Sequence, residues 1–162
     1  GQIYLEPELF YQGTRPAVNV GLSVSRVGSA AQTKAMKKVA GRLRLELAQF
    51  RELASFAQFS SELDESTRRR LERGKILSEI LKQGELDPMP FEKQVVLIYA
   101  GTNGYFDGST MEEVAKKKDE LLEYVRKLHE KLLEDIQKQG ELTKEIEESL
   151  KKALHDFNSL PK

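Results

Sequence analysis

Arg26 is the residue of this sequence whose type and position best suit chemistry. It ends the stretch Val20-Gly21-Leu22-Ser23-Val24-Ser25-Arg26, and Gly28 and small residues follow it. This pattern predicts a strand that ends at a glycine-containing turn, and open α/β sheets present ligands at that place. A guanidinium there suits a phosphoryl group, because its planar fork matches the oxygens of a phosphate. The alternative is that Arg26 pairs with a carboxylate and holds the end of the strand.

No other motif supplies a complete set of catalytic groups. The phosphate-binding pattern Gly-x-x-x-x-Gly-Lys-Ser/Thr does not occur, and residues 28–33 lack its second glycine and its lysine. The Gly-x-Ser-x-Gly elbow, the His-Glu-x-x-His helix and the EF-hand loop are also missing. The sequence has no cysteine, which excludes disulfides, thiolate zinc sites and cysteine nucleophiles. We therefore expect neither a metal site nor an autonomous active site.

The remaining polar clusters favour a solvated surface. Segment 67–73 carries four arginines, but Glu62, Asp64 and Glu65 precede them and Glu72 lies among them. It is either a contact surface for a partner or a helix face with internal ion pairs. Lys116-Lys117-Lys118 is interpreted as a solvated first turn or two of a helix. The two histidines, His129 and His155, are interpreted as surface or half-buried side chains.

Composition indicates a helical protein with a modest core. The 162 residues include 26 Lys and Arg against 26 Asp and Glu, so the formal net charge is zero. Zero net charge argues against a dedicated nucleic-acid binder, which needs a basic surplus. The charged fraction is 32% and the hydrophobic fraction 39%, a balance in which much of the surface is solvated. The longest apolar run, residues 95–100, is far shorter than the roughly 20 residues of a membrane-spanning helix.

The sequence changes character near residue 28. Residues 1–28 hold four of the eleven glycines and two of the five prolines, with β-branched and aromatic runs at residues 3–5, 17–20 and 22–25. These runs predict short strands, which are too few to form a stable sheet alone. We therefore expect residues 1–28 to be a strand-rich edge, the remnant of a sheet whose other strands are absent.

From residue 29 onward the hydrophobic spacing becomes helical. Apolar residues at intervals of three and four predict a long helix over 31–59, with Gly41 as a bend or a close contact. Asp64 can cap a second helix over 65–83, and Pro90 suits the first turn of a third helix that reaches residue 101. Since the run 95–100 has no polar face, the third helix is expected to be the most buried.

Two more helices complete the bundle. Ser109-x-x-Glu112 is typical of a capping box, and the apolar spacing that follows predicts one fourth helix that ends at Gly140. The last helix covers 142–157, where apolar residues recur at intervals of four, four, four and three. The predicted fold class is mainly α: a C-terminal bundle of about five helices over 29–162, preceded by the strand-rich segment.

Several long runs resemble one known family, the α subunit of the F-type, or rotary, ATP synthase. The similarity is carried by Ala17-Val18-Asn19-Val20-Gly21-Leu22-Ser23-Val24-Ser25-Arg26, Leu81-Lys82-Gln83-Gly84-Glu85 and Ile98-Tyr99-Ala100-Gly101. It is close over residues 1–107 and rests on pattern alone in the last two helices. The resemblance implies the C-terminal third of that subunit. Residues 1–28 would then end the nucleotide-binding domain, and residues 29–162 would form the C-terminal α-helical domain.

The resemblance implies a catalytic role for Arg26. This residue matches the arginine finger that reaches across an interface to the γ-phosphate held by the catalytic β subunit. Ser23 matches a nearby position that the family needs for activity. The protein would therefore complete the active site of a neighbour, and it would not be an enzyme on its own.

The resemblance also implies one side of a non-catalytic nucleotide site. Arg15 and Pro16, together with Gln83 and Glu85, match positions around the adenine of ATP or ADP, which the intact α subunit binds with Mg²⁺. The P-loop that would hold the phosphates is absent from this sequence. Glu85 replaces the usual Gln, and a carboxylate can accept a hydrogen bond from the adenine amino group but cannot donate one. Asn103 stands where the family usually has Arg.

The implied partners are those of a rotary ATP synthase, in which ATP synthesis and hydrolysis are coupled to proton transport. They are the β subunits of an alternating hexameric ring, the γ subunit shaft and the δ subunit. Segment 62–73 would face the rotating shaft, which favours the partner interpretation of its arginines. The complex would lie at the cytoplasmic face of the bacterial plasma membrane as a peripheral assembly. The alternative function is a free-standing helical interaction module without ATPase activity.

Overall fold

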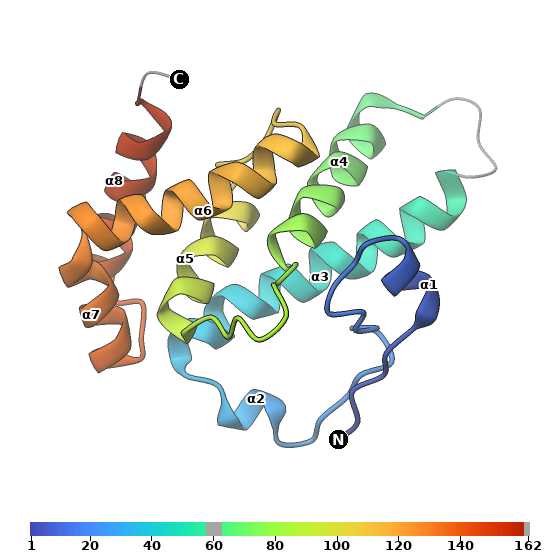
Figure 1. Cartoon of the computed structure of the whole chain (residues 1–162), viewed down its shortest axis with the longest axis horizontal. Helices are drawn as coiled ribbons and strands as arrows, with labels where there is room; N and C mark the ends of the chain where they lie inside the picture. Colours follow the sequence, from blue (N-terminus) through green and yellow to red (C-terminus); the bar gives the residue numbers. More distant parts are fainter. Residues whose placement is uncertain (58–62, 161–162) are drawn as a thin grey trace.

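The computed structural model describes residues 1–57 and 63–160, and in that part of the protein the regular structure is helical (Figure 1). The helices described are α1 (Pro7–Tyr11), α2 (Gly28–Ala31), α3 (Lys34–Ala57), α4 (Glu65–Ile80), α5 (Phe91–Thr102), α6 (Met111–Leu128), α7 (Glu130–Gln139) and α8 (Lys144–Asn158). The predicted helical bundle is therefore confirmed from α3 onward.

Helices α3 and α4 lie side by side and run in opposite directions (Figure 1). Helix α5 packs against both of them, and α6, α7 and α8 close the bundle around α5. Helix α3 was expected to bend or make a close contact at Gly41. A Cβ atom at this position would meet nothing within 4 Å among the described residues, so Gly41 makes no close contact there.

Helix α5 is the centre of the core, as its apolar run predicts. Residues 95–102 are all buried in the protein interior. Thr102 is 1% exposed, and its hydroxyl donates to the carbonyl oxygen of Ile98 at 2.8 Å, which satisfies the polar group within the helix. None of the helices in residues 1–57 and 63–160 is long and apolar enough to cross a membrane.

Two of the predicted helix ends are confirmed, and one is displaced. The Asp64 carboxylate accepts from the backbone N–H of Thr67 at 3.0 Å, and Gly140 ends α7 with a φ of 60°. The capping box begins one residue later than expected, because Thr110 and Glu113 form it. Ser109 instead accepts a hydrogen bond from the Lys117 ammonium at 2.6 Å.

The single helix predicted over 109–140 is wrong, because the helical backbone breaks at His129. The backbone of His129 has φ −134° and ψ 36°, and α6 ends before it while α7 begins after it. The apolar spacing continues through the break, so both helices still direct an apolar face into the core.

The expected strand-rich segment is also wrong. Within residues 1–57 and 63–160 the only β pairing is an isolated antiparallel bridge between Leu5 and Val18, and residues 7–11 form the short helix α1. The apolar side chains of this region are largely exposed, with Ile3 at 75% and Val24 at 62%. Two short extended runs bury too little surface to form a stable sheet without further strands. The division of the protein at residue 28 into two domains stays a prediction.

Candidate functional sites

Arg26 lies in the turn that leads into α2, at the end of the N-terminal segment (residues 1–31). Its side chain is exposed, and no ion pair or hydrogen bond engages it among the described residues. A carboxylate partner, the structural alternative for this residue, is therefore not found in residues 1–57 and 63–160. The guanidinium is therefore exposed on the surface of the described part of the protein.

Ser23 helps to hold the turn that precedes Arg26. Its Oγ accepts from the backbone N–H of Tyr4 at 3.0 Å and donates to the carbonyl oxygen of Asn19 at 2.6 Å. Asn19 is the centre of this turn, since its Oδ1 accepts from the backbone N–H of Gly21 at 2.9 Å. Sequence reasoning did not single out Asn19, although Asn followed two residues later by Gly is a turn signal.

Two of the residues expected around an adenine are joined directly. The backbone N–H of Gln83 donates to the carbonyl oxygen of Arg15 at 2.9 Å, which ties the N-terminal segment to the end of α4. The Arg15 guanidinium lies 4.3 Å from the centre of the Phe10 ring. The Gln83 amide donates to the carbonyl oxygen of Asp87 at 3.0 Å, while the Glu85 side chain is exposed and has no partner among the described residues.

Gln83 and Glu85, in the loop that follows α4, supply hydrogen-bond acceptors. The Gln83 side-chain oxygen and the Glu85 carboxylate are acceptors that suit an exocyclic amino group. A bound triphosphate also needs a cradle of backbone N–H groups and a lysine, and the sequence lacks that motif. The group that would be held here is the base, with the phosphates lying elsewhere.

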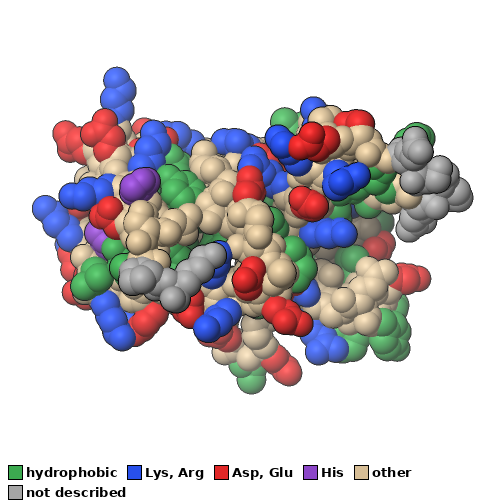
Figure 2. Space-filling model, turned by 90° about the horizontal axis from the view of Figure 1, so that it is seen from above, with side chains coloured by type: hydrophobic (Ala, Val, Ile, Leu, Met, Phe, Trp, Pro, Cys, Tyr) green, Lys and Arg blue, Asp and Glu red, His purple; other side chains and the backbone are tan. Residues whose placement is uncertain are grey.

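The arginine-rich segment of α4 is partly paired. Arg69 pairs with Glu65 and Arg73 pairs with Asp107, whereas Arg68 and Arg70 are exposed and unpaired among the described residues. Figure 2 shows basic and acidic side chains interspersed over one face of the molecule, without a field of a single sign. Two of the four arginines, Arg69 and Arg73, are therefore engaged within the protein, and the other two, Arg68 and Arg70, are accessible to a partner.

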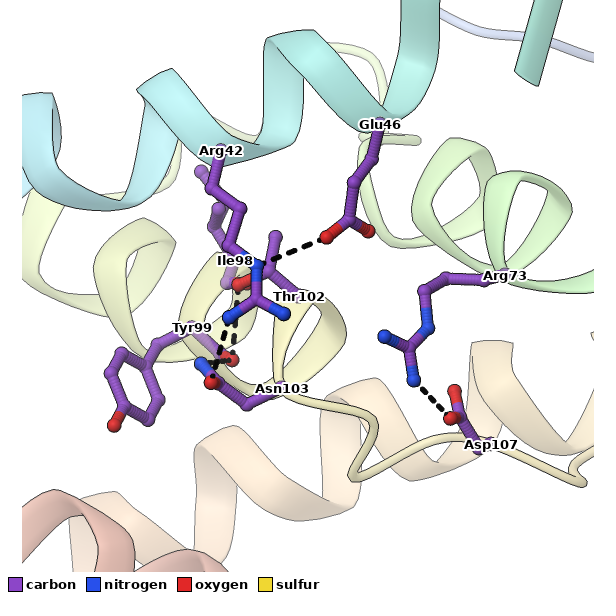
Figure 3. Close-up of polar contacts among 8 residues, drawn as sticks. All are labelled: Arg42, Glu46, Arg73, Ile98, Tyr99, Thr102, Asn103 and Asp107. Atoms are coloured by element: carbon purple, nitrogen blue, oxygen red, sulfur yellow. Dashed lines mark hydrogen bonds and ion pairs between the residues drawn. The ribbon is translucent and has the colours of Figure 1, made fainter. Parts of the chain in front are cut away.

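Two arginines tie α3 and α4 to the turn that follows α5 (Figure 3). Arg42 on α3 donates to the Asn103 side-chain oxygen at 3.1 Å and to Glu46 at 3.1 Å, and Arg73 on α4 pairs with Asp107. Asn103 accepts the Arg42 hydrogen bond, which an arginine at this position, having no acceptor, could not do. Sequence reasoning identified Asn103 and Asp107 only as turn residues.

The other polar residues have structural surroundings. His129 is half-buried, with Nε2 3.4 Å from the Tyr124 hydroxyl, and His155 is exposed. Lys118 differs from its expected solvated state, since its half-buried ammonium donates to the carbonyl oxygen of Lys82 at 2.8 Å. Within the described residues, no cluster of His, Asp and Glu has the composition of a metal site.

Comparison with known families places this helical domain in a defined class. The family model that describes the C-terminal domain of the ATP synthase alpha/beta chain matches residues 32–157, which is the bundle from the start of α3 to the end of α8. The protein therefore belongs to the family of C-terminal domains of ATP synthase α and β subunits. Members of this family are parts of a multi-subunit enzyme, and this protein is accordingly a component of such an assembly.

Proposed function

We propose that the protein is part of the non-catalytic α subunit of a rotary ATP synthase and supplies Arg26 to the catalytic site of a neighbouring β subunit. The observation that carries the proposal is the position of Arg26 itself. Its guanidinium is exposed and unpaired among the described residues, at the end of a segment that Ser23 and Asn19 hold in place. Such a group is available to a neighbouring molecule, and the run that ends at Arg26 resembles the α subunit.

The chemistry of phosphoryl transfer explains why an arginine from a neighbour is useful. Negative charge spreads over the equatorial oxygens of the transferred γ-phosphoryl group in the transition state. A guanidinium that reaches those oxygens stabilises the transition state more than the bound nucleotide, so it raises the turnover rate. An arginine supplied in trans contributes about 10³–10⁵ in rate. The subunit interface then controls the reaction, because it sets the position of this arginine.

Residues 1–28 are proposed to be the end of the nucleotide-binding domain. Their exposed apolar side chains support this interpretation, because Ile3, Leu22 and Val24 are between 58% and 75% exposed and such surface is usually covered by another structure. Arg15, Pro16, Gln83 and Glu85 are proposed to line the adenine side of the non-catalytic site for Mg-bound ATP or ADP. The junction between Arg15 and Gln83 supports that grouping.

The partners follow from the same proposal. The β subunits would flank this subunit in the ring, and the δ subunit would join the assembly. Segment 62–73 would face the γ subunit shaft; residue 62 lies outside the described residues, and the exposed Arg68 and Arg70 support this part of the proposal. The assembly, in which ATP synthesis or hydrolysis is coupled to proton transport, would be peripheral at the cytoplasmic face of a bacterial membrane.

The test is turnover per intact complex after replacement of Arg26. We expect Arg26→Ala to reduce steady-state ATP hydrolysis by orders of magnitude while nucleotide affinity at the catalytic sites changes much less. Arg26→Lys is expected to restore little, because an ammonium lacks the planar fork that grips two oxygens together. Turnover is normalised to the amount of assembled complex.

Arg44→Ala is a matched control. Arg44 is an exposed arginine on α3 that has no partner among the described residues, so its loss is expected to leave turnover unchanged. Near-normal turnover of assembled Arg26→Ala complexes would rule out the proposed role. Reduced assembly with normal turnover would assign Arg26 a structural role instead.

A further inference from the structure

The side of α3 that points away from the core is exposed along most of the helix. Residues three and four positions apart share one face of a helix. At this spacing α3 carries an exposed strip, here called the outer strip, which consists of Gly41, Leu45, Ala48, Glu52 and Phe56. The residues of α3 that enter the core, such as Leu43 and Leu47, lie on the opposite side. The outer strip is therefore accessible to another molecule.

The outer strip is largely apolar. Leu45 is 59% exposed and Phe56 is 64% exposed, and Ala48 lies between them. Single exposed apolar side chains are ordinary on a protein surface, but here they recur at helical spacing on one face. Small residues beside a larger one make the groove and the ridge through which two helices pack. The shape and the polarity of the strip thus suit a second helix.

Gly41 supports the same interpretation. A glycine inside a helix costs about 1 kcal/mol relative to alanine. A Cβ atom at Gly41 would meet nothing within 4 Å among the described residues, so packing within this part of the protein does not require a glycine. A missing side chain lets another backbone approach closely. Close packing of a partner beside Leu45 explains the glycine, which the bundle itself does not.

The charges of α3 indicate what kind of helix this is. Residues 34–42 carry four cations and no carboxylate, and the first turn of α3 holds no acidic residue. Cations at this end are unfavourable, because the N-terminus of a helix carries a partial positive charge. Lys37 is exposed and unpaired among the described residues, and Glu52 is the one carboxylate of the outer strip. A partner with acidic side chains near the start of α3 complements this distribution.

We propose that the outer strip docks an amphipathic helix of a neighbouring subunit, with aliphatic side chains against Leu45 and Phe56 and carboxylates beside Lys37. A second copy of this protein fits less well. The strip is about 22 Å long and about 10 Å wide, whereas each partner in a stable dimer buries about 800 Å². In an assembly, other contacts between the same subunits supply the remaining area. The inference rests on the proposed place of the protein in an ATP synthase, but it does not depend on Arg26.

The first experiment uses the absence of cysteine from the sequence. Ala48→Cys places one thiol on the outer strip, and its reaction with a maleimide is followed by mass spectrometry of this chain, in the intact complex and in the free 162-residue protein. We expect labelling to be at least about tenfold slower in the complex, because thiol reactivity requires access. Complex dissociated in urea is expected to regain fast labelling.

Equal labelling rates in the intact and the free protein would overturn the inference and leave the proposed function standing. Absence of the protein from any complex would overturn both, so the two failures are distinguishable. Slow labelling of the free protein together with a dimer mass in sedimentation would assign the strip to a second copy, which also contradicts the inference.

Two sets of variants test the shape and the charge of the strip. Gly41→Leu fills the open position and is expected to reduce the yield of assembled complex about tenfold, because it blocks close approach. Lys152→Leu, at an exposed position of α8, is the matched control, and an equal loss in both would overturn the inference. Circular dichroism checks each fold, and the labelling of Ala48→Cys decides if Gly41→Leu does not fold.

Lys37 tests the acidic character of the partner. Lys37→Glu is expected to lower assembly several-fold, because like charges face each other across the contact. Lys37→Arg keeps the positive charge and is expected to assemble normally. Equal yields of complex from Lys37→Glu and Lys37→Arg would contradict an acidic partner at this end of α3.

Discussion

The guanidinium of Arg73 lies directly over Gly104 and pairs with Asp107, so α4 is fastened across the turn that follows α5 (Figure 3). A Cβ atom at Gly104 would lie 2.8 Å from Nη2 of Arg73 and 2.9 Å from Oδ2 of Asp107. The φ of Gly104 is +81°, a left-handed conformation that side chains rarely adopt. The turn therefore needs glycine here for two separate reasons.

Comparison with Gly108 separates those two reasons. Gly108 has a similar φ of +76°, but its Cβ position meets nothing within 4 Å among the described residues. Gly108→Ala is expected to lower the free energy of unfolding by about 1–2 kcal/mol for the left-handed backbone alone. Gly104→Ala is expected to cost about 0.5–1 kcal/mol more, because the new methyl group displaces the partly exposed Arg73–Asp107 pair. Equilibrium urea unfolding measures both losses, and equal values would contradict the close contact.

Gly74 and Gly41 allow the same comparison inside helices, because one position is crowded and the other is open. The ring of Phe50 lies against Gly74 of α4, so an added Cβ atom would clash with Cβ and Cγ of Phe50. Gly74→Ala is expected to lower the free energy of unfolding by about 1–3 kcal/mol through overpacking. Gly41→Ala in α3 has open space and is expected to raise it by about 1 kcal/mol, because alanine is the better helix former. A stabilising Gly74→Ala would show that the two helices are not closely packed there.

The helices could be predicted wherever apolar spacing and a capping residue agreed. Asp64 and Gly140 mark ends that the structure confirms, and the apolar run of α5 predicts its burial correctly. The break at His129 was not predictable, because the apolar spacing is continuous through it. The displaced capping box has a simple reason: Ser109-x-x-Glu112 and Thr110-x-x-Glu113 both match the pattern, and sequence alone does not choose between them.

The N-terminal segment shows why strand propensity is a weaker guide. Residues 17–25 have β-branched side chains, but a strand forms only where another strand pairs with it. In the candidate sites, only the structure shows that the Arg26 side chain is exposed. The proximity of Arg15 to Gln83 was implied by the resemblance alone, because residue spacing in a sequence does not show which distant segments lie together. The ties from Arg42 and Arg73 could not be predicted, because surface arginines have many possible partners.

Acid is expected to loosen the contact between α3 and α8 through Glu147. A hydrogen bond from Lys38 holds the pKa of Glu147 below its ordinary value, and the Tyr99 hydroxyl at 3.0 Å adds to this. Since the folded pKa is the lower one, ionised Glu147 contributes stability above the unfolded pKa of about 4.3, and this is lost as the pH falls through the folded pKa.

The corresponding variant is Glu147→Gln, measured by urea unfolding at pH 7 and at pH 3. Its loss of stability is expected to be larger at pH 7, because the wild-type carboxylate is partly protonated at pH 3 and its contribution is then smaller. Glu148→Gln is the control, since Glu148 is exposed and unpaired among the described residues. A loss that is the same at both pH values would show that the charge of Glu147 does not matter.

Nucleotide binding by the isolated 162-residue protein is expected to be weak. Arg15, Gln83 and Glu85 are proposed to line one edge of an adenine, but the sequence has no glycine-rich loop and lysine for the phosphates. We therefore expect no hydrolysis of Mg-ATP and no micromolar affinity. A calorimetric titration that gives a micromolar dissociation constant would show that other residues hold the phosphates.

The Arg42–Asn103 contact can be tested by placing at position 103 the arginine that the resemblance to the α subunit implies there. Arg42 donates to the Asn103 side-chain oxygen at 3.1 Å, and Asn103 donates to the carbonyl oxygen of Tyr99 at 2.8 Å. Asn103→Arg removes the acceptor and sets two guanidiniums against each other. We expect it to lower the free energy of unfolding by about 1–2 kcal/mol.

A double-mutant cycle decides whether Arg42 is the cause of that loss. Arg42→Ala removes the competing guanidinium, so the Arg42→Ala, Asn103→Arg double variant is expected to be about 0.5–1 kcal/mol more stable than the sum of the single losses predicts. Asn103→Met is the control, because it removes the same side-chain hydrogen bonds without adding a charge. In the Asn103→Met background, Arg42→Ala is expected to restore less stability than in the Asn103→Arg background. Strict additivity in the arginine background would show that the two positions do not interact. Coupling confined to the arginine background would instead show that Arg42 on α3 and an arginine at position 103 compete for the same space.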